Sequence, residues 1–536
     1  MRLRQPLVRE ALLSAAAAGA VAAVLAWLGP PGTDFAAHAY QRTLFLEHGF
    51  TLWNNFWYAG RYSFVTYSLI YYPLAGLLGI RLLAVATIAL AALAFAVVLW
   101  REWGAETRWS SRTFAVVWAG IVLSAAFPFA LGMSLALLAI WALQAGKRWR
   151  FAALAGLTLA ASPLSFLLLV FFLGGVAIAR RETLWRNWVP IAGVVAVALV
   201  EVALWRIFPG EGRFPFSGLE LAGGIAFCAS SLVLTWRVER ARVLRFFFAI
   251  YLTAIVAMYL VPTAIGENIA RLRYASIPIM VLVFALRRWQ PRWACVGVLV
   301  LAVAWNVSPL AYSLFRNGGD VTTQAKTWSS AISYLEAHLK PSYRVEAVDT
   351  TTHSAAVYLA DARIPLARGW YRQDDFPQNE VFYDAHLGAK SYLSWLHGLG
   401  VGYIVLAHAT PDYSSQGEAK LVRSGRLGLQ RVFHTSELSI YKVPHARSII
   451  TGPRRPLITS MTQSRIGLVV HRGGTYRIAV RWSPYWHASL GCLTEGKDKM
   501  IRLTTRHPHF VQLTFQVDAA RALNEIVGQQ PTCKLP

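Results

Sequence analysis

Asp34, His38 and Arg42, near the N-terminus, are spaced for chemistry at a phosphate. Steps of four residues place all three on one face of a helix that begins just after the carboxylate. A carboxylate beside two potential cations can act as a general base next to a bound phosphate. The alternative is that Asp34 only caps a helix whose polar face meets water. We favour the chemical interpretation, because the stripe is expected at a membrane surface among aromatic residues.

A second candidate is the polar run Pro262–Arg273, which contains Glu267 and Arg271. The run lies between two apolar segments, on the side of the membrane where arginine is disfavoured. Arg271 is therefore costly unless it binds something, and a lipid-linked phosphate is a suitable anion. The alternative is a salt bridge from Arg271 to Glu267, four residues earlier, and both interpretations can hold together.

A third candidate is the loop-like run Ala367–Asn379 in the C-terminal part of the chain. Flat aromatic faces beside planar hydrogen-bonding groups suit a sugar. An alternative with almost equal support is that these groups dock the loop on the membrane domain. The candidate acceptor-binding residues are Trp370, Tyr371, Arg372, Asp374 and Asp375.

Several common catalytic motifs are absent from the sequence. It contains no GxSxG, HExxH, GxxxxGK[ST] or dinucleotide-binding pattern, which argues against a nucleotide-binding ATPase and a zinc hydrolase. His507 and His509 form a pair, but two surface histidines without further ligands rarely hold a metal. The sequence therefore specifies no cofactor and leaves a divalent metal open.

The elements that must position these residues are membrane helices. Of the 536 residues 56% are hydrophobic, and the long apolar runs fall before about Asn306. A helix that crosses about 30 Å of hydrocarbon needs about 20 apolar residues. We therefore predict an α-helical polytopic bundle of about eleven transmembrane helices over residues 1–313. Its first run, Ala11–Leu28, is interpreted as an anchor, because no small-x-small cleavage site follows it.

The formal net charge of +25 indicates topology rather than nucleic-acid binding. Most basic residues of the membrane half gather in short clusters between alternate apolar runs, and such loops stay in the cytoplasm. This predicts a cytoplasmic N-terminus, an odd number of spans and an extracytoplasmic C-terminal part at the plasma membrane. The clusters are Arg2/Arg4/Arg9, Arg101/Arg108/Arg112, Lys147/Arg148/Arg150, Arg180/Arg181/Arg186, Arg237/Arg240/Arg242/Arg245 and Arg287/Arg288/Arg292.

Two segments of the membrane half stand out. Phe151–Ala179 is too short for two full spans and too long for one, and Ser162-Pro163 near its centre predicts a hairpin of two short helices. Pro30–Gly79 is rich in aromatic residues, which are common at the headgroup level. It is expected on the exported side, either as a cap on the bundle or as part of a substrate site.

The C-terminal part is predicted to hold two domains. Helices and strands alternate from Thr322 to Val443, which predicts an α/β domain over residues 314–443. Strands alone follow Pro444, which predicts a small β-sandwich over residues 444–536. Cys228 and Cys295 fall in apolar runs and are expected to be small apolar residues. Cys492 and Cys533 fall in the exported part, where an oxidising environment favours a disulfide between them.

Together these features resemble the GT-C superfamily of glycosyltransferases, in which an exported first loop opens with an Asp. Four runs also resemble a bacterial, largely actinobacterial, membrane family named "6-pyruvoyl-tetrahydropterin synthase-related". The zinc pattern of the soluble pterin synthases is absent here. The four runs are TDFAAHAYQ, GENIARLR, ARGWYRQDDFPQN and YLSWLHGLGVGYIVL.

The resemblance to the GT-C superfamily implies an inverting glycosyltransferase that uses a polyprenyl-phosphate sugar on the exported face. It implies that Asp34 deprotonates the acceptor hydroxyl. It also implies that Arg271, with His38 or Arg42, holds the donor phosphate.

Many GT-C enzymes also have a second acid, for which Glu267 and Glu47 are the candidates here. The implied partners are the lipid bilayer, the polyprenyl-phosphate sugar and a cell-envelope glycan or glycolipid acceptor, with no nucleic acid. The alternative is a non-catalytic relative that binds, transports or assembles lipid-linked glycans.

Overall fold

The computed structural model describes residues 4–181, 188–210, 212–384 and 386–528. The chain forms two compact units, and the boundary between them cuts the chain several times. The first comprises Met1–Phe35, Tyr67–Val202 and Glu211–Gly318. The second comprises Ala36–Thr66, Ala203–Gly210 and Gly319–Pro536.

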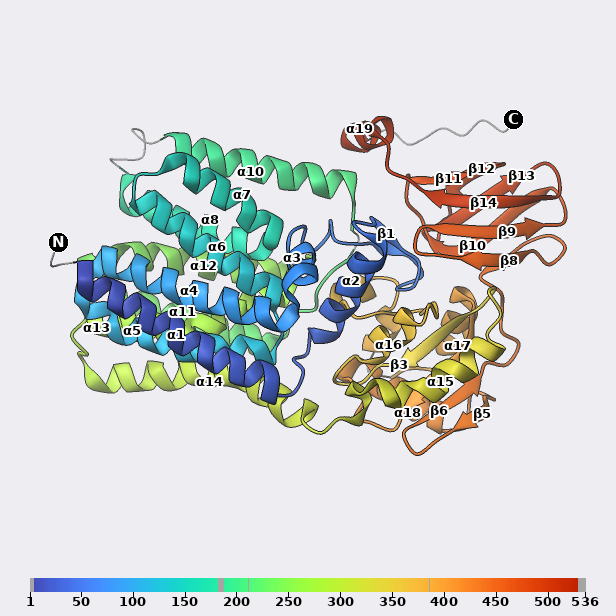
Figure 1. Cartoon of the computed structure of the whole chain (residues 1–536), viewed down its shortest axis with the longest axis horizontal. Helices are drawn as coiled ribbons and strands as arrows, with labels where there is room; N and C mark the ends of the chain where they lie inside the picture. The colour runs from blue at the N-terminus through green and yellow to red at the C-terminus, as the bar shows by residue number, and fades with distance from the viewer. Residues whose placement is uncertain (1–3, 182–187, 211, 385, 529–536) are drawn as a thin grey trace. The chain divides into compact units, whose positions relative to one another are not determined.

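The first unit is a bundle of apolar helices (Figure 1). Within the described residues, eight helical stretches are long and apolar enough to cross a membrane. One of them, Ile80–Leu123, has 44 residues, about twice what one crossing needs, and it is interrupted at Gly104. The bundle has more helical segments than these eight, because Ile80–Leu123 divides into two and the shorter α7 and α8 are added. The segments are α1 (Arg4–Leu28), α4 (Ile80–Trp103), α5 (Arg108–Val117) with η2 (Trp118–Leu123), α6 (Phe127–Gln144), α7 (Arg148–Ala161), α8 (Pro163–Ala179), α10 (Trp188–Ile207), α11 (Gly218–Thr235), α12 (Arg242–Leu260), η4 (Gly266–Ala275) with α13 (Ser276–Leu286), and α14 (Arg292–Asn317).

These eleven segments, drawn from the described part of the chain, confirm the predicted polytopic helical bundle. The predicted hairpin is present as α7 and α8. Between them Ser162 is extended, with φ −163° and ψ 112°, and its side chain accepts a hydrogen bond from the Ser165 amide. Short connecting helices complete the unit: α3 (Tyr71–Leu78), η1 (Gly104–Thr107) and η3 (Glu239–Ala241).

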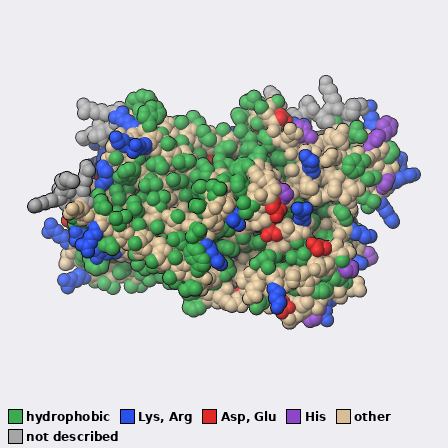
Figure 2. Space-filling view, in the orientation of Figure 1, with side chains coloured by type: hydrophobic (Ala, Val, Ile, Leu, Met, Phe, Trp, Pro, Cys, Tyr) green, Lys and Arg blue, Asp and Glu red, His purple; other side chains and the backbone are tan. Residues whose placement is uncertain are grey.

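The basic clusters share one end of the bundle, where Figure 2 shows Lys and Arg gathered. Contacts between the ends of different helices establish this, although Arg2 and Arg186 lie outside the described residues. Each contact joins a residue of one cluster to a helix end that carries another cluster. The contacts are Arg112 with Glu10, Arg101 with the Gln144 carbonyl, Arg180 with Glu102, Arg240 with Glu106, and Arg287 with the Leu234 carbonyl.

The second unit contains the α/β fold that the alternating pattern predicts. Its four-stranded sheet has the order β3-β4-β6-β5, in which only β3 and β4 are parallel. The strands are β3 (Arg344–Val348), β4 (Val401–Ala407), β5 (Gln430–His434) and β6 (Leu438–Lys442). The helices are α15 (Ala325–His338), α16 (Ala355–Asp361), α17 (Ala389–Leu399) and α18 (Gln416–Arg423), with the short turns η5 (Val321–Thr323), η6 (Arg372–Asp375), η7 (Glu380–Tyr383) and η8 (Tyr413–Ser415).

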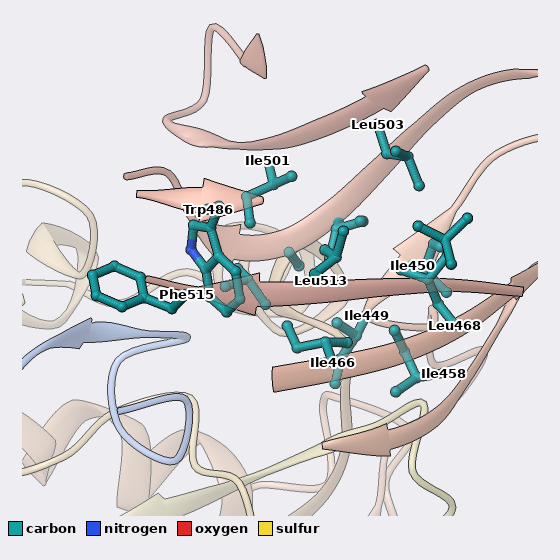
Figure 3. Close-up of a cluster of buried hydrophobic side chains, with 14 of the residues drawn as sticks. Ile449, Ile450, Ile458, Ile466, Leu468, Trp486, Ile501, Leu503, Leu513 and Phe515 are labelled. Carbon is teal, nitrogen blue, oxygen red and sulfur yellow. The ribbon is translucent and has the colours of Figure 1, made fainter. Parts of the chain in front are cut away.

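The last part of the second unit is a β-sandwich of two four-stranded sheets, β12-β13-β10-β7 and β11-β14-β9-β8. Both sheets contribute apolar side chains to one core, including Ile501 from one sheet and Leu513 from the other (Figure 3). The strands are β7 (Ile450–Thr451), β8 (Leu457–Met461), β9 (Arg465–Val470), β10 (Gly474–Arg481), β11 (Trp486–Ala488), β12 (Cys492–Glu495), β13 (Met500–Thr505) and β14 (His509–Phe515), and helix α19 (Ala519–Val527) follows them.

The aromatic segment near the N-terminus belongs largely to this second unit. It forms α2 (Phe35–His48) and a small hairpin of β1 (Trp53–Asn54) and β2 (Arg61–Tyr62). Trp53 is buried in the sandwich core and stacks on Phe515, with ring centroids 4.8 Å apart. The Trp57 indole donates a hydrogen bond to the Ala356 carbonyl at 2.8 Å. These aromatic side chains therefore pack inside a folded unit.

The shared basic end generates a topology prediction. A reporter fused within Arg237–Arg245 should be cytoplasmic, and one fused after Leu310 should be extracytoplasmic, because positively charged short loops stay inside. A fluorescent protein and alkaline phosphatase at each position measure the two locations. Phosphatase activity at the first position or none at the second would refute the predicted orientation.

Candidate active site

The centre of the candidate site is an ion pair within the first unit. The Nη2 atom of Arg271 donates to Oδ2 of Asp34 at 2.9 Å. The two residues are 237 positions apart in the sequence. The carboxylate singled out near the N-terminus and the arginine of the later polar run are thus brought into direct contact.

The backbone holds Asp34 in a tight turn after α1. The Asp34 amide donates to the Ser124 carbonyl at 3.0 Å, at the end of η2. Gly32 permits this approach, because a Cβ atom there would lie 2.5 Å from the Ala125 nitrogen and 2.6 Å from the Val122 carbonyl oxygen. A side chain at position 32 would therefore push the Asp34 turn away from η2.

Arg271 is carried by η4, which begins at a second restricted glycine. Gly266 has φ +43°, and a Cβ atom there would lie 2.1 Å from the Phe214 carbonyl oxygen. The Gly266 amide donates to the Thr263 hydroxyl at 3.0 Å, and this fixes the entry into η4. The guanidinium carbon of Arg271 lies 5.9 Å from the centre of the Phe129 ring, within cation–π range.

Tyr67 is a third member of the site that the sequence did not identify. Its hydroxyl is hydrogen-bonded to Arg271. Burial raises the pKa of Tyr67, although the charge of Arg271 acts in the opposite direction. The tyrosine therefore stays protonated at neutral pH. The only early signal was its place in the aromatic segment Pro30–Gly79.

The ion pair remains partly accessible. The Asp34 side chain is 23% exposed and the Arg271 side chain 15% exposed. A guanidinium has five N–H donors, and Asp34 occupies Nη2. A second anion can contact the donors that Asp34 and Tyr67 leave, so the arrangement places a carboxylate beside a group able to bind an anion.

The two candidates for a second acid, Glu267 and Glu47, contact groups other than Asp34 and Arg271. Glu267 accepts a hydrogen bond from the Ser217 amide at 2.9 Å. The alternative salt bridge from Arg271 to Glu267 is therefore wrong: Arg271 pairs with Asp34 instead. Glu47 lies on α2 in the second unit, with an oxygen 3.5 Å from the His48 ring. The role of either glutamate as a second acid stays a prediction.

His38 and Arg42 also lie on α2, in the second unit, and His38 is fully buried. Their participation in a phosphate site with Asp34 and Arg271 stays a prediction. So does the capping role of Asp34, although α2 begins at the next residue as expected.

The candidate acceptor-binding residues lie in the second unit, and most of them are buried and in contact with neighbouring side chains. Trp370, Tyr371, Arg372 and Asp375 are each at most 7% exposed. The Arg372 guanidinium pairs with Asp412 at 2.9 Å and lies 4.7 Å from the centre of the Trp370 ring. Burial alone would raise the pKa of Asp412, but Arg372 holds it well below its usual range.

The two aspartates of this run also have partners. Asp374 pairs with Arg61 of β2 at 2.6 Å, and Asp375 accepts a hydrogen bond from the Tyr383 hydroxyl at 2.6 Å. The Tyr58 hydroxyl bonds both the amide and the carbonyl of Tyr371. These contacts dock the loop on the hairpin of β1 and β2 within the second unit, and docking on the membrane domain stays a prediction. Acceptor binding by this run stays a prediction.

A buried charge network beside this run was missed by the sequence reasoning. Arg368 donates from Nε to Glu346 at 2.7 Å and also pairs with Glu418. The Tyr392 hydroxyl donates to Glu418 at 2.6 Å. Burial raises the pKa of Glu346 and Arg368 opposes that shift. The signal available was Glu346 itself, an acid inside the apolar strand β3.

The metal and the disulfide are tested only in part. Within the described ranges, no three His, Cys, Asp or Glu side chains gather as a metal-binding group, and the Asp34 carboxylate faces a guanidinium. Cys228 and Cys295 are free and buried, as expected. Cys492 is buried on β12, but Cys533 lies outside the described residues, so the disulfide stays a prediction.

The fold defines a multi-pass membrane protein with a sheet-rich C-terminal region. No family model and no curated protein matches the chain, so the narrower resemblance to the "6-pyruvoyl-tetrahydropterin synthase-related" family is not supported.

Two solved structures of the arabinofuranosyltransferase AftD from Mycobacteria are similar to this chain. One is 16% identical with a TM-score of 0.48 and covers 80% of this chain. The other, a mutant of the same enzyme, is 17% identical with a TM-score of 0.46 and covers 81%. The alignments cover 40% and 42% of the AftD chains, so this chain spans less than half of their length. At this similarity no residue role and no activity carries over.

The contacts of Arg372 generate a stability prediction. Arg372→Gln should destabilise the protein by about 3–5 kcal/mol, because Asp412 is left buried without its cation. Thermal unfolding of the purified chain measures the loss. Arg423→Gln, at an exposed position of α18, is the matched control and should change stability by less than about 0.5 kcal/mol. An unchanged unfolding temperature for Arg372→Gln would instead favour a binding role for this arginine.

Proposed function

We propose that this protein is a membrane glycosyltransferase of the GT-C type. It transfers a sugar from a polyprenyl-phosphate donor to a cell-envelope glycan or glycolipid on the exported face. The observation that supports the proposal is the partly exposed ion pair of Asp34 and Arg271. It lies where α1 has already left the basic end of the bundle, at which Glu10 of the same helix pairs with Arg112.

The two side chains have complementary tasks in this reaction. Attack of a hydroxyl on the anomeric carbon requires removal of the hydroxyl proton as the new bond forms, and Asp34 accepts it. The bond from the anomeric carbon to the donor phosphate breaks at the same time, with inversion. Arg271 and the Tyr67 hydroxyl stabilise the charge that develops on the leaving phosphate.

The ion pair also orders these events. In the resting protein the Asp34 carboxylate accepts a hydrogen bond from Arg271 Nη2 at 2.9 Å, which occupies its Oδ2 atom. A donor phosphate competes for the guanidinium and weakens its hold on the carboxylate. Asp34 therefore becomes an effective base only when a donor phosphate is bound to Arg271.

A second candidate function is a non-catalytic relative that binds, transports or assembles lipid-linked glycans. The same ion pair favours it in one respect. A carboxylate paired with an arginine can have a purely structural role, which is to join the α1–α2 turn to η4. The two functions differ in what the Asp34 carboxylate must do, and that difference can be tested.

Asp34→Asn should abolish turnover and leave the fold and donor binding nearly intact. The amide keeps the size and an acceptor oxygen for Arg271 but loses the basicity, so the rate should fall by a factor of about 10² to 10⁴. The measurement is sugar transfer from a panel of polyprenyl-phosphate donors, together with the unfolding temperature. A fully active variant would rule out Asp34 as the base.

Arg271→Lys should weaken donor binding more than it lowers the unfolding temperature. Lysine keeps the charge but loses the fork of donors that contacts both Asp34 and a phosphate. Arg273→Lys is the matched control, because Arg273 lies on the same segment and pairs with Glu220 at 2.8 Å. Equal donor affinities in the two variants would mean that Arg271 has no specific role in binding the phosphate.

A further inference from the structure

A basic pocket lies within the second unit, between α17 and the β-sandwich. Its volume is about 720 Å³. One wall is the face of α17 that carries Lys390 and His397. The opposite wall comes from Arg447 in the connecting segment and from Arg477 on β10. The remaining lining residues are Leu393, Ser394, Gly398 and Thr451.

Positive charge dominates the pocket. None of its lining residues is acidic, and neither Lys390 nor Arg447 forms an ion pair with any residue that the structure describes. Arg477 has one carboxylate neighbour, Asp498 at 2.7 Å, and Asp498 also pairs with Arg502. The His397 Nε2 atom lies 2.9 Å from the Pro444 carbonyl oxygen and donates to it. An anion in the pocket would therefore meet hydrogen-bond donors on both walls.

A buried arginine behind the pocket wall adds to this charge. Arg344 is fully buried at the start of β3, and its Nη1 donates to the Leu399 carbonyl at 2.7 Å, next to Gly398 of the pocket. Its Nε and Nη2 atoms have no hydrogen-bond partner in the described part of the chain. Burial, together with the charges of Arg481 and Arg477, lowers the pKa of Arg344 to about 9.

A buried guanidinium without a counter-charge is costly, because desolvation is not repaid by an opposite charge. Among the residues that the structure describes, the charges that act on Arg344 come from two further arginines, Arg481 and Arg477, and not from acids. An anion held by Lys390, Arg447 and Arg477 would supply it from the adjacent pocket. The uncompensated charge therefore indicates an anionic ligand and not merely a solvated basic surface.

We propose that this pocket binds a phosphate ester, with the phosphate between Lys390, Arg447 and Arg477. Guanidinium groups match the oxygens of a phosphate, and an ammonium adds a third positive charge. The pocket is large enough to hold a sugar beside the phosphate, and the hydroxyl groups of Ser394 and Thr451 can bond to it. The site does not depend on Asp34 or on the proposed transfer reaction.

The test measures binding to the full chain in an uncharged detergent by isothermal titration calorimetry. The probes are inorganic phosphate, glucose 1-phosphate and glucose. A flotation assay with vesicles, with and without phosphatidylglycerol, distinguishes a free phosphate ester from a lipid headgroup. The double variant Lys390→Gln/Arg447→Gln removes two exposed charges from the pocket. The matched control, Lys420→Gln/Arg431→Gln, removes two exposed charges from α18 and β5.

Glucose 1-phosphate should bind and glucose should not, and the pocket variant should weaken the affinity by about tenfold or more, as expected for losing charge-assisted bonds. The control should retain the affinity. Binding only to phosphatidylglycerol vesicles, lost in the pocket variant alone, would support the site and assign the phosphate to a lipid. Failure of both glucose 1-phosphate and the vesicles to bind, or equal weakening in both double variants, would overturn the proposal.

Discussion

The hydrocarbon of the membrane is the constraint on which the rest of this structure depends. A backbone inside it must satisfy its own hydrogen bonds, so the chain crosses as helices, and charged side chains are confined mainly to helix ends. Both ends of the bundle show the result. At one end, arginines pair across helices with Glu10, Glu102 and Glu106. In the turn that follows α1, the chain brings together one acid and one arginine from distant segments, Asp34 and Arg271.

The arginines of the two units differ in how many of their hydrogen-bond donors already have partners within the protein. Arg368 and Arg372 are buried, and each is surrounded by carboxylates, hydroxyls and aromatic rings of the same unit. Such groups hold elements together and have little capacity left for a ligand. Arg271 is partly exposed, and Arg344 is buried with two nitrogens unpartnered among the described residues. Unused hydrogen-bonding capacity, more than charge itself, separates the candidate binding residues from the structural ones.

Much of the architecture follows from local patterns in the sequence. Apolar runs separated by arginines predict the bundle, because length and charge are properties of single segments. Ser162-Pro163 predicts the break between α7 and α8 for the same reason. The run Arg465–Val470 was predicted as a strand and is β9. The short strands β7 and β11 were not predicted, because two or three residues carry no periodicity.

The site could be predicted only in part. Asp34 and Arg271 were each conspicuous, but their contact joins residues 237 positions apart and depends on how η2 and η4 pack. The salt bridge from Arg271 to Glu267 was the local alternative, and the long-range partner prevailed. Tyr67 carried no signal beyond its aromatic neighbours. The run from Trp370 to Asp375 has the composition of a sugar-binding surface, but its burial is a tertiary property that composition does not encode.

The segment 36–66 has a consequence for how the protein is made. The Asn55 side chain bonds the Thr462 carbonyl, 407 residues later, and Trp53 packs against Phe515. At a synthesis rate of about 5–20 residues per second, about 20 to 90 seconds of translation separate these partners. During that time Trp53 is synthesised without the core that later buries it. Trp53 therefore reaches its buried position only after the sandwich has been made.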